Sequence, residues 1–75
     1  MRVSDMRYAV VIEPCTSNYS AYVPDLPGCI ATGESVEEAG RNIREAIRFH
    51  IDGMREDGTP LPAPSTRVEY IEVVS

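Results

Sequence analysis

The sequence has no lysine and no tryptophan, and it contains one histidine, one phenylalanine and two cysteines among 75 residues. Its seven basic residues are therefore all arginines, and its 12 acidic residues bring the formal net charge to −5. Proteins that follow a nucleic-acid backbone need clustered positive charge to displace counterions. We therefore expect no direct nucleic-acid binding, and an acidic surface is better matched to a basic protein partner.

Recognisable metal and nucleophile motifs are also missing. Cys15 and Cys29 form no C-x-x-C pair, and His50 stands far from both in a helical stretch. Zinc sites and disulfide scaffolds normally use more ligands or more cysteines. We therefore predict two reduced thiols and no metal, cofactor or catalytic residue. The minor enzymatic alternative is a magnesium-dependent nuclease built on acids near predicted strand ends, namely Glu13, Asp25 and Glu34.

No apolar run approaches the roughly 20 residues that span a bilayer, and the N-terminus lacks the apolar core of a signal peptide. We therefore expect a cytoplasmic protein without membrane contact. A chain of 75 residues is near the lower size limit for folding without disulfides or metals. We predict that residues 1–75 form a single domain, and that a homo-oligomer, either a dimer or a tetramer, adds stability.

Three short segments have the β-branched and aromatic composition of strands: "RYAVVIEP" (7–14), "YSAYV" (19–23) and "CIATG" (29–33). The links between them are too short for a crossover, so we expect an antiparallel meander. The link "PDLPG" combines two prolines, which fix φ, with a glycine that accepts conformations other residues resist. It is predicted to be a stiff turn, with Leu26 either tucked beneath it or offered outward.

A long amphipathic helix is predicted to begin after Ser35, because Ser35 and Glu38 have the spacing of a capping box. Apolar residues then recur with helical spacing at Val36, Ala39, Ile43, Ala46, Ile47, Ile51 and Met54. Gly58 and Pro60 end the pattern, which predicts a helix of about 21 residues.

After the helix, the proline-rich connector 59–65 leads to "RVEYIEVV", which is predicted to be a fourth strand at Arg67–Val74. The expected fold class is α+β with the order β-β-β-α-β. It comprises an antiparallel meander, one long helix packed on one face, and a C-terminal strand that returns to the sheet.

Three motifs in order resemble the HicB-like antitoxin family. They are "PDLPGC" (24–29), "GESVEEA" (33–39) and the connector from Asp57-Gly58 to Ser65, and the resemblance covers Tyr8 to about Ser65. It implies a partial ribonuclease H-like fold and a non-enzymatic domain that binds a small basic HicA-type toxin, an enzyme that cleaves mRNA. Longer members of the family append a DNA-binding domain, and we expect no C-terminal DNA-binding domain within these 75 residues.

The resemblance leaves two other functions open: a solitary homo-oligomer without a toxin partner, and the nuclease. For a partner surface, rigidity and charge favour the stiff turn and the acid before the helix. The predicted partner-binding residues are Pro24, Asp25, Leu26, Pro27, Gly28 and Glu34. The alternative is that the turn only braces the sheet.

Overall fold

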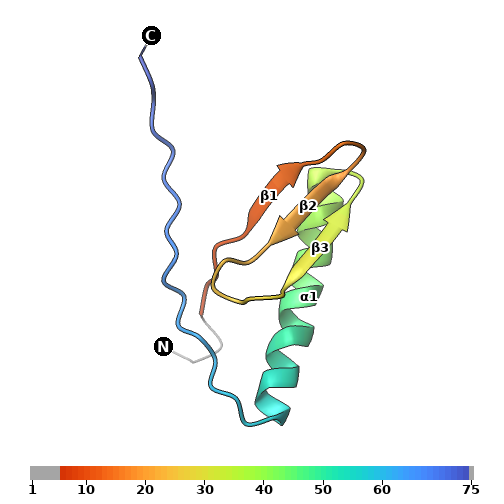
Figure 1. Cartoon of the computed structure of the whole chain (residues 1–75), viewed down its shortest axis with the longest axis vertical. Helices are drawn as coiled ribbons and strands as arrows, with labels where there is room; N and C mark the ends of the chain where they lie inside the picture. Colours follow the sequence, from red (N-terminus) through yellow and green to blue (C-terminus); the bar gives the residue numbers. More distant parts are fainter. Residues whose placement is uncertain (1–5, 75) are drawn as a thin grey trace.

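The computed structural model describes residues 6–74, and within them a three-stranded sheet is followed by one long helix (Figure 1). The strands are β1 (Val11–Pro14), β2 (Tyr19–Tyr22) and β3 (Ile30–Gly33), and the helix is α1 (Val36–Glu56). Both strand pairs are antiparallel and β2 is central. The predicted meander and helix are confirmed.

Strand β1 is shorter than the predicted segment 7–14 because its partner turns away. Val11 lies opposite Tyr22, and beyond Tyr22 the chain enters the turn to β3, so residues 7–10 have no ladder partner. At the other end, the Cys15 N–H donates a hydrogen bond of 2.7 Å to the Asn18 carbonyl and closes the link to β2. Strand β1 is therefore an edge strand, and residues 7–10, which lead into it, are not paired with another strand.

Both ends of α1 are stopped by local hydrogen bonds. The Ser35 hydroxyl accepts from the Glu38 N–H at 3.0 Å, and the Glu38 carboxylate accepts from the Glu34 N–H at 2.6 Å. At the C-terminal end Gly58 has a φ of 71°, and its N–H donates to Arg55 while the Thr59 N–H donates to Met54. This is the Schellman arrangement expected of a C-terminal glycine.

The core is small and lies where the start of α1 crosses β2 and β3. Its buried residues are Ala21, Val23, Leu26, Cys29, Ala39 and Ile43. The crossing is close, since a Cβ on Gly33 would lie 2.3 Å from the Ala39 nitrogen. The helix continues past the sheet, so its C-terminal half has no strand beneath it (Figure 1). No helix in the described part of the chain is long and apolar enough to cross a membrane.

The predicted return of a fourth strand to the sheet is not confirmed by the structure of this single chain. Residues 67–74, here called the arm, have no ladder partner and run away from the sheet (Figure 1). Its large apolar side chains are 55–95% exposed. A strand apolar on both sides needs a neighbouring strand and a covering layer, and the chain leads the arm away from both.

Candidate binding surface

The stiff turn forms as predicted, and its own hydrogen bonds hold it. The Leu26 N–H donates to the Val23 carbonyl and the Cys29 N–H donates to the Leu26 carbonyl, both at 3.0 Å. Gly28 has a φ of 85°, where a side chain would be strained. Leu26 is fully buried, so it braces the turn from within and does not present a surface. Pro24, Pro27 and Gly28 are exposed.

Asp25 is engaged by a distant part of its own chain. Its carboxylate accepts hydrogen bonds from the backbone N–H groups of Ser65 and Thr66 at 2.9 and 3.0 Å. It also accepts from the two hydroxyls, at 3.2 Å for Ser65 and 2.8 Å for Thr66. These bonds, led by those from Thr66, hold the pKa of the Asp25 carboxyl below its usual value.

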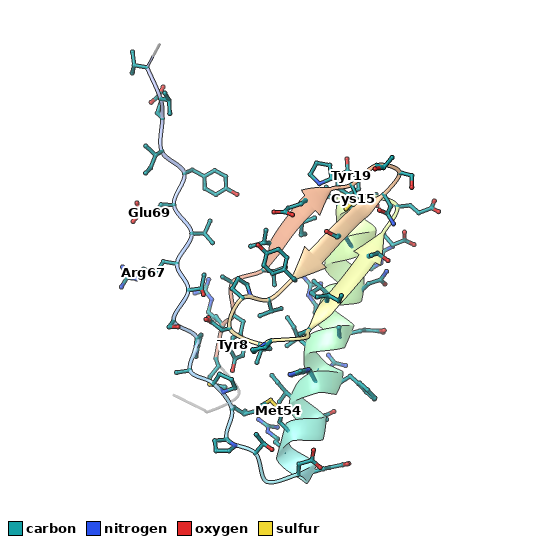
Figure 2. All side chains as sticks on the ribbon, viewed as in Figure 1. Tyr8, Cys15, Tyr19, Met54, Arg67 and Glu69 are labelled. Atoms are coloured by element: carbon teal, nitrogen blue, oxygen red, sulfur yellow. The ribbon has the colours of Figure 1, made fainter. Side chains whose placement is uncertain are left out.

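Tyr8 makes a second tie to the same connector. Its hydroxyl donates a hydrogen bond of 2.5 Å to the Pro62 carbonyl. Burial, and then the nearby charge of Asp25, raise the pKa of the Tyr8 hydroxyl. Figure 2 shows Tyr8 beside the base of the arm. We call this group the clamp, made of Tyr8, Asp25, Pro62, Ser65 and Thr66. Sequence patterns did not indicate it, because its partners are 40 or more residues apart.

The predicted partner-binding residues lie before and after β3. Asp25 lies in the turn before β3 and Glu34 directly follows β3, so the whole strand stands between them in the chain. Glu34 is exposed, and its N–H serves the helix cap. Within residues 6–74, no three His, Cys, Asp or Glu side chains gather where they would share a metal ion. Cys15 is exposed and Cys29 is buried, and burial raises the pKa of the Cys29 thiol.

Two surface features were not predicted, and both lie along α1. The first is a groove of about 770 Å³ between α1 and the chain leading into β1. Its floor is apolar and its rim is basic. The floor includes Tyr8, Val10, Ile12, Ile43, Ile47 and Ile51, and the rim includes Arg44, Arg48 and Arg55. The signal in the sequence was the spacing of these arginines, four and seven residues apart, which places them in one row of a helix.

The second feature is a shallow depression around Phe49, the single phenylalanine of the chain. Phe49 is 83% exposed and lies outside the apolar stripe of α1. The depression is also lined by Asn42, Glu45, Ala46, Arg48 and Asp52. We call Asn42, Glu45, Phe49 and Asp52 the Phe49 patch. An exposed aromatic side chain between acids is a typical anchor for a protein partner.

Fold and surface together define a small acidic α+β domain with an apolar, arginine-rimmed groove and an exposed aromatic patch along its helix. The model of the HicB-like antitoxin of bacterial toxin–antitoxin systems matches residues 8–73. The chain therefore belongs to the HicB-like antitoxin family. The match includes nearly all of the arm, which is thus part of the family's domain.

Individual relatives support the same assignment. An uncharacterised 14.9 kDa protein of Haemophilus phage HP1 is 44% identical over 66 residues, and "Antitoxin HicB 2" of Photorhabdus laumondii is 33% identical over 70 residues. These alignments cover 88% and 92% of this chain, and the chain spans half the length of each relative. A chain of the HicA3 and HicB3 toxin–antitoxin complex has a similar structure, with a TM-score of 0.68 and 30% identity. The similarity covers 80% of this chain and 70% of that one.

Proposed function

We propose that this chain is an antitoxin domain that binds a basic HicA-type toxin and neutralises it without catalysis of its own. The observation that carries the proposal is the structural similarity to a chain of the HicA3 and HicB3 toxin–antitoxin complex. The net charge of −5 suits a basic ribonuclease partner. The partial ribonuclease H-like character implied by the sequence motifs is a finer part of the same proposal.

The contact that we propose is the Phe49 patch. Aromatic side chains dominate binding energy at interfaces, and acids around them steer a basic partner into place. Among the residues predicted from the sequence, Pro24, Pro27, Gly28 and Glu34 are exposed and remain proposed contacts. Asp25 is not among these proposed contacts, because its carboxylate is already bound by the connector.

The test is a binding titration against a HicA-type toxin from the same genome, used in a catalytically inactive form. We expect Phe49→Ala to raise the dissociation constant at least about 10-fold, the equivalent of about 1.4 kcal/mol. Ile30→Ala is the matched control, because Ile30 is 70% exposed on β3, away from the patch, and its loss should leave binding unchanged. Binding should also weaken as salt screens the acids.

Growth rescue gives the functional readout. Co-expression of the wild-type chain with active toxin should restore growth, and the Phe49→Ala chain should restore less of it. No binding at micromolar concentrations, or rescue that depends on neither charge nor Phe49, would contradict the proposal. RNA cleavage by the purified chain that requires Mg²⁺ and is lost in Glu13→Gln would instead establish the nuclease alternative.

A homo-oligomer is also proposed. It is compatible with the antitoxin role because the four residues of the Phe49 patch are not among those that line the basic groove, although Arg48 borders both surfaces. The groove and the arm suggest how such an oligomer forms.

A further inference from the structure

The arm exposes apolar side chains that a folded domain would ordinarily cover. Tyr70 is 95% exposed, and Ile71, Val73 and Val74 are each more than 75% exposed. Arg67 and Glu69 point away from the sheet (Figure 2). Because side chains alternate along an extended chain, Val68 and Tyr70 share the opposite side. An exposed apolar strand of this kind is a template for pairing with another chain.

The length of the groove is close to the length of the arm as an extended strand. Along α1 it runs from Gly40 to Arg55, about 23 Å at 1.5 Å per residue. The eight residues of the arm span about 26 Å at 3.3 Å per residue. The groove lies beside the free edge of β1, where residues 7–10 have unpaired backbone groups. A strand placed there would extend the sheet and receive cover from the part of α1 that has no strand beneath it.

The charges of the two elements are complementary. The rim of the groove carries Arg44, Arg48 and Arg55, whereas the arm carries Glu69 and Glu72 against a single Arg67 and so has a net charge of −1. The acidic Phe49 patch on the same helix would repel the arm. Charge therefore selects the groove as the surface that the arm fits.

The clamp fixes the point at which the arm leaves its own domain, and this bears on which copy of the chain provides the arm for the groove. It binds the chain at Pro62, Ser65 and Thr66, directly before the arm, and from this point the arm leaves its own sheet (Figure 1). We propose that the groove binds the arm of a second copy of this chain, so that two chains exchange arms and each completes the other's sheet as a fourth strand. The inference does not depend on the proposed toxin binding, and its test contains no toxin.

The first experiment is light scattering on the whole chain after size-exclusion chromatography. We expect a mass of twice 8.3 kDa, or a multiple of that dimer. The double variant Val68→Asp/Tyr70→Asp should raise the dimer dissociation constant at least about 100-fold, because each of the two arm contacts loses at least a factor of about 10. Ala63→Asp places one such charge in the exposed connector outside the arm and is the control for added negative charge.

The second experiment distinguishes exchange from an arm that folds back on its own groove. Arg44→Glu/Arg48→Glu reverses the exposed rim and should also give monomers, while Arg41→Glu, outside the groove, should not. Mixing the arm variant with the rim variant should yield heterodimers, because one intact arm still meets one intact groove. Monomers in that mixture overturn the proposal.

An isotope-filtered NMR measurement on mixed labelled and unlabelled chains supplies a readout of contact. We expect nuclear Overhauser effects between the Tyr70 ring and the methyl groups of Ile47 or Ile51 across chains. The same effects found only within one chain would overturn the exchange, as would a monomeric wild-type chain.

Discussion

Replacing Gly33 with alanine is the sharpest test of how α1 is seated on the sheet. An added Cβ would lie 2.3 Å from the Ala39 nitrogen and 2.8 Å from the Ala39 Cα. Both are backbone atoms, so no side chain can rotate away, and the helix start must move off β3. Overpacking of this kind destabilises by about 1–3 kcal/mol or more. A domain of this size has roughly 4–11 kcal/mol in total at 0.05–0.15 kcal/mol per residue.

Gly53→Ala is the matched control, because nothing lies within 4 Å of the added Cβ and Gly53 is inside α1. There alanine should stabilise by up to about 1 kcal/mol, since glycine is a poor helix former. The two identical substitutions should therefore have opposite signs. The measurement is urea unfolding at one fixed chain concentration, because any association adds to the apparent stability.

The melting temperature of Gly33→Ala should fall by about 4 °C or more, while the urea m-value stays unchanged. If Gly33→Ala unfolds at the same urea concentration as the wild type while Gly53→Ala is stabilised, α1 does not sit closely on β3. The packing that positions both the groove and the Phe49 patch would then be wrong.

Three further predictions concern the cap and the clamp. Ser35→Ala should lower the free energy of unfolding by about 1 kcal/mol and Ser35→Asp should retain it, as urea unfolding would show. Because the folded-state pKa of Asp25 is depressed, its contribution is present above the ordinary carboxyl pKa and is lost as pH falls through the folded value. Urea midpoints should therefore drop on acidification less in Asp25→Asn than in the wild type, and equal slopes would contradict the clamp. Tyr8→Phe should cost about 1 kcal/mol near neutral pH, because the hydrogen bond to Pro62 is lost. Since the folded-state pKa of Tyr8 is raised, the wild type should keep this advantage below the ordinary tyrosine pKa and lose it as pH rises through the folded value, as a pH series of melts would show.

Local signals made most of the fold predictable. The bounds of α1 follow from signals at its own ends. The capping pair Ser35 and Glu38 marks its start, the apolar stripe marks its length, and Gly58 marks its end. The stiff turn followed in the same way from its prolines and glycine. Each of these features is formed by residues that are close together in the sequence, so the sequence alone is enough to predict it.

Long-range features were not predictable by the same means. The clamp joins Asp25 to Ser65 and Thr66, which are 40 and 41 positions away. No sequence pattern in either segment indicates the other as its partner. The arm was predicted to be a strand from its composition, but composition does not say which sheet a strand joins. The exposed position of Phe49 was not predicted, because it depends on which side of α1 the sheet leaves uncovered.

The charges of α1 explain why the two proposed surfaces would bind different partners. One row of the helix is basic and borders an apolar groove, and another row places Glu45 and Asp52 around an exposed Phe49. An acidic arm is attracted by the first row and repelled by the second, and a basic toxin has the opposite preference. Because like charges brought together cost several kcal/mol at an interface, the acids around Phe49 disfavour the arm and the arginines of the groove disfavour a basic toxin. A single helix can therefore join two copies of the chain and still keep its acidic side free for a toxin.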